Sequence, residues 1–146
     1  MATSSYEVNP LLGIGPLRLG ASKAEIHSIL GEPESKKGSA ELFLGSSIQV
    51  HYHENGGVEF IEIASDIPVT WNQMDIFSTP ADFLVEAISK FTPLQNEDNE
   101  QGYTYTFPES EVALWRPTLS DEEDPEDGKY FASIGVGCRG YYSVAI

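Results

Sequence analysis

Cysteine, basic residues and long apolar runs are all scarce in this chain. The single cysteine, Cys138, excludes an intramolecular disulfide and any zinc site built from several cysteines. No run approaches the roughly 20 apolar residues that a membrane-spanning helix needs. The polar start, residues 1–10, lacks the basic region and apolar run of a secretory signal. These absences predict a cytoplasmic protein without disulfides and without a membrane span.

The shortage of bases leaves the chain strongly acidic, with 8 Lys and Arg residues against 23 Asp and Glu residues and a net charge of −15. Such a charge repels nucleic acid and anionic lipid, and it speeds association with a cationic partner. Residues 1–73 hold nine acids and four bases, whereas residues 74–146 hold fourteen and four. The densest cluster is a loop that contains Asp121, Glu122, Glu123, Asp124, Glu126 and Asp127. It predicts either a contact for a basic partner or a solvated loop that only aids solubility.

The 146 residues, 40% of them hydrophobic, predict a single domain over residues 1–146. Ser22 and Glu25 form the capping-box pattern that starts a helix, and Ile26 begins its apolar face. Gly31 and Pro33 then end this helix after about nine residues.

An alternating segment follows this helix and predicts a strand over residues 47–54. Asn55-Gly56 is a strong hairpin signal, with a return strand over residues 57–64. A two-residue loop would pair His51 with Phe60, Val50 with Ile61 and His53 with Val58. The core face would then carry Ile48, Val50, Ile61 and Ile63, and the other face His51, His53, Phe60 and Glu62.

The second half of the chain repeats this order of elements. A short strand at residues 74–77 precedes a helix capped by Ser78 or Thr79, and extended segments follow at residues 103–107, 111–116, 130–136 and 141–144. The first half also has short extended segments at residues 17–19 and 41–44, before and after its helix. Both halves therefore contain the order β-α-β-β-β, as pseudo-repeats of about residues 13–66 and 74–146 after an N-terminal arm, residues 1–12. The prediction is an α+β two-layer sandwich with a largely antiparallel sheet and two helices on one face.

The segment from Gly13 to Ser22, together with Leu30-Gly31-Glu32-Pro33, resembles a motif of small bacterial domains. In these domains a helix ending in L-G-x-P is followed by antiparallel strands. The β-lactamase inhibitor protein family, which has two such units in tandem, and the small lipoproteins of the outer-membrane β-barrel assembly machinery share this arrangement. The rest of the chain, including residues 74–81, 111–117 and 129–142, resembles bacterial proteins of this size. Some of these proteins resemble small immunity proteins encoded beside secreted toxins. The resemblance implies an α+β fold and a function in protein binding.

Residue patterns for catalysis or metal binding are weak. His51 and His53 have a spacing that metal sites use, and Glu62 could approach them, but no firm third ligand follows, so no metal or cofactor is expected. No serine lies in a Gly-x-Ser-x-Gly turn, and no glycine loop suits a phosphate. Cys138 has no histidine beside it in the sequence and is interpreted as a half-buried residue near a turn. The chain is therefore not expected to be an enzyme.

Aromatic residues supply the best candidates for partner binding. Trp115, Arg116 and Tyr103 are of the types that most often anchor interfaces. With His51, His53, Phe60 and the acidic loop they form the predicted contact set. The leading hypothesis is an immunity-type protein that binds and neutralises a basic toxin domain. The alternatives are a small-molecule-binding or regulatory domain, and an enzyme whose site is not recognisable.

Overall fold

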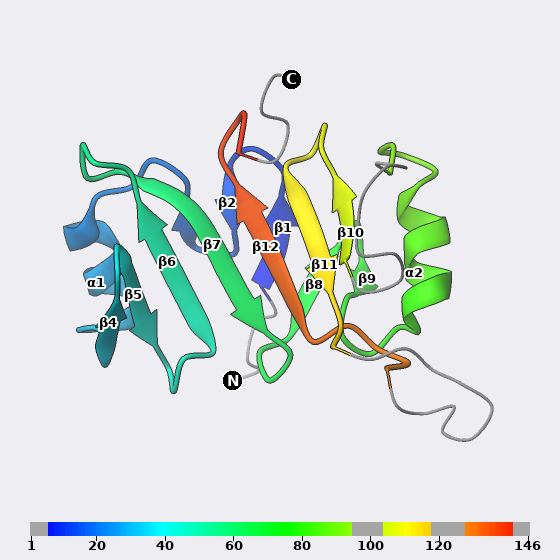
Figure 1. Ribbon diagram of the computed structural model, residues 1–146, viewed down its shortest axis with the longest axis horizontal. Coiled ribbons are helices and arrows are strands. Elements are labelled where there is room, and N and C mark those ends of the chain that lie inside the picture. Colours follow the sequence, from blue (N-terminus) through cyan, green and yellow to red (C-terminus); the bar gives the residue numbers. More distant parts are fainter. Residues whose placement is uncertain (1–5, 95–103, 118–127, 142–146) are drawn as a thin grey trace.

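The computed structural model describes residues 6–94, 104–117 and 128–141. Within these ranges the chain forms two helices and twelve strands in two mostly antiparallel sheets, so the predicted α+β class is confirmed. The prediction of a single sheet is wrong, because short strands near the N-terminus and in the middle of the chain pair with one another to form a second sheet. The two sheets and the helices together make a broadly sandwich-like molecule (Figure 1).

The large sheet has seven strands. Its strands run in the order β10 (Thr104–Phe107), β11 (Val112–Trp115), β12 (Ser133–Gly137), β7 (Val58–Ala64), β6 (Ile48–Tyr52), β5 (Ala40–Phe43) and β4 (Ser35–Lys37). All six neighbouring pairs are antiparallel. Strands of the first half, β4 to β7, therefore meet strands of the second half, β10 to β12, where β7 pairs with β12.

The small sheet has five short strands. They run in the order β3 (Leu17–Arg18), β2 (Gly13–Ile14), β1 (Tyr6–Asn9), β8 (Val69–Trp71) and β9 (Met74–Asp75). Its central pair, β1 with β8, is parallel. Residues 6–9, which the sequence analysis assigns to an arm, thus form the middle of a sheet, with Val8 buried. Strand β8 has no counterpart among the predicted strands.

The core lies between the large sheet and the elements behind it. Ile48, Val50, Ile61 and Ile63 face this core as the alternation predicts, and all four are fully buried. Helix α1 (Lys23–Leu30) and helix α2 (Ala81–Ile88) lie at opposite ends of the molecule, on either side of the small sheet (Figure 1). The buried side chains of both sheets and both helices form one hydrophobic cluster.

The predicted helix starts are confirmed for α1 but not for α2. Ser22 accepts from the Glu25 backbone N–H at 3.2 Å and the Glu25 carboxylate reaches back to Ser22, so the capping box is present. Helix α2 begins after Pro80 without a side-chain cap, and the prediction of a Ser78 or Thr79 cap is wrong. The Asp75 carboxylate instead binds the backbone N–H groups of residues 77 and 78, which orders the chain before the helix.

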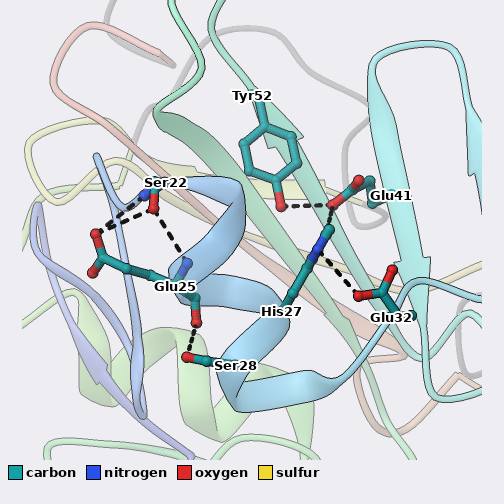
Figure 2. Close-up of polar contacts among 7 residues, drawn as sticks. All are labelled: Ser22, Glu25, His27, Ser28, Glu32, Glu41 and Tyr52. Atoms are coloured by element: carbon teal, nitrogen blue, oxygen red, sulfur yellow. Dashed lines mark hydrogen bonds and ion pairs between the residues drawn. The ribbon is translucent and has the colours of Figure 1, made fainter.

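Helix α1 is joined to the large sheet by a buried polar cluster (Figure 2). Glu41 of β5 points into the core face and its side chain is only 4% exposed. Its Oε1 accepts from the Tyr52 hydroxyl at 2.8 Å and from His27 Nε2 at 2.9 Å. The Glu32 carboxylate lies 3.8 Å from the other ring nitrogen of His27. A buried carboxylate with two donors is well satisfied, so the cluster fixes α1 against β5 and β6.

The stability of the protein should fall in acid as Glu41 takes up a proton. Burial alone would raise the pKa of Glu41, but the hydrogen bonds from His27 and Tyr52 outweigh it and hold the pKa below 4.5. The Glu41 carboxylate therefore binds a proton more readily in the unfolded chain than in the folded chain. Its contribution to the free energy of unfolding is complete above the pKa of Glu41 in the unfolded chain. The contribution is lost as the pH falls through the pKa of Glu41 in the folded chain.

The measurement is urea unfolding of the wild-type chain and of Glu41→Gln between about pH 7 and about pH 3. The free energies of unfolding of the two chains should converge in acid. A difference that stayed constant over this range would assign the acid sensitivity to other groups.

Candidate functional site

The outward face of the large sheet, called the open face here, is the candidate binding surface. No described helix or strand lies over it (Figure 1). Open-face positions are those that alternate with the core residues, such as His51 on β6, Phe60 and Glu62 on β7, and Trp115 on β11. An uncovered sheet face that carries large aromatic side chains is typical of an interaction surface.

Small side chains on β12 create a hollow in the middle of the open face. Ser133, Gly135 and Gly137 alternate there with the buried Ile134 and Val136. The hollow holds about 350 Å³ and is lined by Phe60, Glu62, Thr104, Ala113, Trp115, Ser133 and Gly135. Strands β7 and β11 lie about 10 Å apart on either side of β12. Their largest side chains are also offset along the strands, since Phe60 pairs with Gly137 and Trp115 pairs with Ser133.

One wall of the hollow is an aromatic stack around Phe60. The Phe60 ring lies parallel to the Tyr141 ring at 4.5 Å and meets the His51 ring edge-on at 5.4 Å. A Cβ atom on Gly137 would lie 2.6 Å from the Tyr141 Cβ, so glycine at 137 lets Tyr141 reach Phe60. Trp115, whose surface is 41% exposed, lines the diagonally opposite end of the hollow. The hollow therefore has a rigid aromatic side and a more exposed one.

The charge of this surface comes from Glu62. Burial lowers the pKa of His51, although the nearby Glu62 and Glu59 carboxylates partly oppose this shift. Burial also raises the pKa of Tyr141, and the same two carboxylates add to the effect. Two aromatic walls beside a carboxylate suit a cationic side chain, which is attracted by both.

The structure brings together three of the predicted contact residues and separates two others. His51, Phe60 and Trp115 share the open face. His53 lies beyond the end of β6, because the register shifts after His51 and Tyr52, rather than His53, pairs with Val58. The side chain of Arg116 is only 7% exposed, and its guanidinium is bonded within the chain, to the Gly128 carbonyl at 2.8 Å. Tyr103 and the acidic loop residues Asp121, Glu122, Glu123, Asp124, Glu126 and Asp127 lie outside the described residues.

Sequence reasoning missed Tyr141 and the floor of the hollow. The sequence pattern that could have predicted the floor is the alternation of small residues with Ile134 and Val136 over residues 133–137. Such a pattern indicates a strand whose outward face leaves room beside large neighbours. The strand predicted over residues 141–144 has no described counterpart at Tyr141, which is assigned to a bend, and residues 142–144 lie outside the described ranges.

A larger hollow, of about 620 Å³, lies between the start of α1 and the turn after β6. Its walls are mainly glycine backbone and small side chains, with Lys23 and His53 as the larger groups. The capping box already occupies part of the first turn of α1 with Ser22 and Glu25, which weakens this end as an anion site. The open face offers more side-chain contact area and is the stronger candidate.

Two further features of the described residues bear on ligand and membrane binding. Among residues 6–94, 104–117 and 128–141, no three His, Cys, Asp or Glu side chains are grouped closely enough to hold a metal ion. His51 and His53 in particular turn to different partners, the Phe60 ring and the Glu59 carboxylate.

No helix in the described part of the chain has the length and apolar character to cross a membrane.

Comparison with known proteins yields no matching family model, no matching curated protein and no matching solved structure.

Proposed function

We propose that this chain is an immunity-type protein-binding module that acts in the cytoplasm and neutralises a basic toxin domain. It would bind the partner through the open face of the large sheet. The observation that carries the proposal is the hollow between Phe60 and Trp115, with the Glu62 carboxylate beside it. A lysine or arginine of the partner fits this combination, because its stem packs on the rings and its charge meets the carboxylate.

The net charge supports the same class of partner. At −15 the chain attracts a basic domain over a distance and speeds their encounter. Toxin domains that act on nucleic acid are commonly basic, so an acidic protector gains both association rate and complementarity. The negative charges of the acidic loop would add to this attraction, and because salt screens such charges the association rate would be salt-dependent.

A small-molecule-binding or regulatory domain is the alternative. The hollow of about 620 Å³ beside α1 favours it, since a volume of this size suits a small ligand. An enzyme with an unrecognised site is the third class. A ligand that copurifies with the chain and is lost on substitution at Lys23, but not at Trp115, would support the small-molecule alternative.

Truncation of Trp115 should weaken binding to the partner by about 30-fold, the effect of removing one central aromatic anchor. The partner is first identified as a protein that copurifies with the chain from its native cell and whose activity the chain inhibits. Affinity is then measured for the wild type, Trp115→Ala and Glu62→Gln. Glu62→Gln should also weaken binding, and the loss should be largest at low salt.

Phe83→Ala is the matched control, because Phe83 is an aromatic residue of α2 that is 65% exposed and lies outside the hollow. It should bind like the wild type. Equal affinities for Trp115→Ala and Phe83→Ala would place the contact elsewhere on the molecule.

We also propose that the two halves derive from a duplication. Helix α1 is followed by β4 to β7 and helix α2 by β10 to β12, and the last strands of the two sets pair as β7 and β12. This arrangement supports a common ancestor for residues 13–66 and 74–146, and it would make the open face a joint surface of both repeats.

A further inference from the structure

The only cysteine of the chain lies beside two residues that are distant in the sequence. Cys138 Sγ is 3.7 Å from Nε2 of His53, although the two residues are 85 positions apart. The other ring nitrogen of His53, Nδ1, is 3.1 Å from the Glu59 carboxylate. A thiol, an imidazole and a carboxylate therefore stand in a row, each within reach of the next.

A bulge in the hairpin creates this row. His51 pairs with Phe60 and Tyr52 pairs with Val58, which leaves Glu59 as an extra residue between them. Bulges redirect a side chain and are frequent next to functional sites. The backbone N–H of Cys138 donates to the Glu59 carbonyl at 3.0 Å, which continues the regular register of β12 with β7 by one pair. The bulge and this pairing together bring Glu59 between the turn that carries His53 and the segment that carries Cys138.

The loop that carries Cys138 is held at several points. The Cys138 carbonyl accepts from the Tyr141 backbone N–H at 2.9 Å, and the Gly140 N–H donates to the Glu111 carboxylate. The His53 and Glu59 side chains are 41% and 34% exposed, and Cys138 is half-buried. A small reagent can therefore reach the sulfur while the three groups keep their geometry.

We propose that Cys138 is a nucleophilic thiol activated by His53 as general base, with Glu59 as the positioning residue, and that it exchanges with disulfides of small thiols. The thiol S–H bond breaks and its proton passes to His53 Nε2. The sulfur forms a bond to one sulfur of the disulfide, the old S–S bond breaks, and the leaving thiolate takes the proton from His53. The products are a mixed disulfide at Cys138 and one free small thiol.

The surroundings explain why a base is needed. Burial raises the pKa of Cys138, and the carboxylates of Glu59 and Glu111 raise it further. The sulfur is therefore protonated at neutral pH, and its reaction requires proton removal as it attacks. The Glu59 carboxylate holds His53 in the tautomer with hydrogen on Nδ1, which leaves Nε2 free to accept the proton.

A mixed disulfide at this position would also affect the open face. Tyr141, which hydrogen-bonds the Cys138 carbonyl, stacks on the Phe60 ring at the wall of the hollow. An added group on Cys138 would crowd this stack. The proposed thiol–disulfide exchange depends only on the geometry of Cys138, His53 and Glu59, and not on the proposed protein partner.

The test follows the release of pyridinethione from the neutral disulfide dithiodipyridine, which the negative net charge does not repel. As the only cysteine, Cys138 accounts for the whole signal, and Cys138→Ser sets the background. His53→Ala should react at least about tenfold more slowly at neutral pH than the wild type, since a positioned general base contributes about that much or more. Glu59→Gln should show a smaller fall.

Glu54→Ala is the matched control, because Glu54 is an exposed residue that follows His53 in the same turn and is not part of the row. Added imidazole should restore part of the rate of His53→Ala and leave Glu54→Ala unchanged, a result that a structural role for His53 would not produce. The proposal is overturned if His53→Ala reacts as fast as Glu54→Ala or faster, or if imidazole speeds both variants equally.

Discussion

Replacing Glu41 with alanine should lower the free energy of unfolding by about 3 kcal/mol, because the change removes the acceptor of two hydrogen bonds in the core. Tyr52 is only 7% exposed, and its hydroxyl would lose its hydrogen-bond acceptor, the Glu41 carboxylate. His27 would lose the charge-assisted contact that ties α1 to β5. Chemical denaturation at neutral pH measures the loss.

Two variants separate the hydrogen bonds from the volume of the side chain. Glu41→Gln keeps the shape and an acceptor oxygen for Tyr52, so it should cost about 1 kcal/mol. In the double variant with Tyr52→Phe, Glu41→Ala should cost clearly less than it does alone, since no hydroxyl is left unsatisfied. Additive losses in this cycle would show that Glu41 acts through packing and not through the Tyr52 hydrogen bond.

Alanine at Gly13 should be the most damaging small substitution in the chain, with a loss of about 3–5 kcal/mol. A Cβ atom there would lie 2.1 Å from the backbone oxygen of Leu17 and 2.9 Å from the Cα of Arg18. These are backbone atoms of the paired strand β3, so they cannot turn aside as a side chain can. The φ angle of 151° adds backbone strain, since side-chain-bearing residues rarely adopt it.

Gly38→Ala is the control for the strain alone. Gly38 also has a positive φ, 62°, but a Cβ atom there meets nothing within 4 Å. It should therefore cost only about 1–2 kcal/mol. Thermal and urea unfolding of both variants give the comparison, and similar losses would mean that β2 and β3 can separate without harm to the core.

The parts of the fold that sequence reasoning predicted are those with local causes. The capping box of α1 joins residues three apart, and the Asn55-Gly56 turn joins neighbouring strands. Strands β1 and β8 escaped prediction because each is short and finds its partner far along the chain, in the parallel pair of Tyr6 with Val69. A periodic pattern over three or four residues is too short to indicate such a pairing.

The candidate site was predictable to a similar degree. Alternation predicted that His51 and Phe60 share one face, whereas Trp115, two strands away from Phe60, was chosen by residue type alone. The stack of Tyr141 on Phe60 and the approach of Cys138 to His53 depend on the pairing of β12 with β7, which joins distant segments. The bulge at Glu59 was missed because a two-residue turn implied an unbroken register.

The central position of β7 and β12 has a consequence for the order in which the chain can fold during synthesis. Strand β7 ends at Ala64, but its neighbour β12 begins only at Ser133, so β7 leaves the ribosome long before β12 is made. At about 5–20 residues per second, β7 waits several seconds with one edge unpaired and Ile61 and Ile63 uncovered on the side of β12. An unpaired hydrophobic edge invites pairing with another nascent chain. Slow or paused synthesis between residues 64 and 133 should therefore increase aggregation of this protein, and fast synthesis of this stretch should protect it.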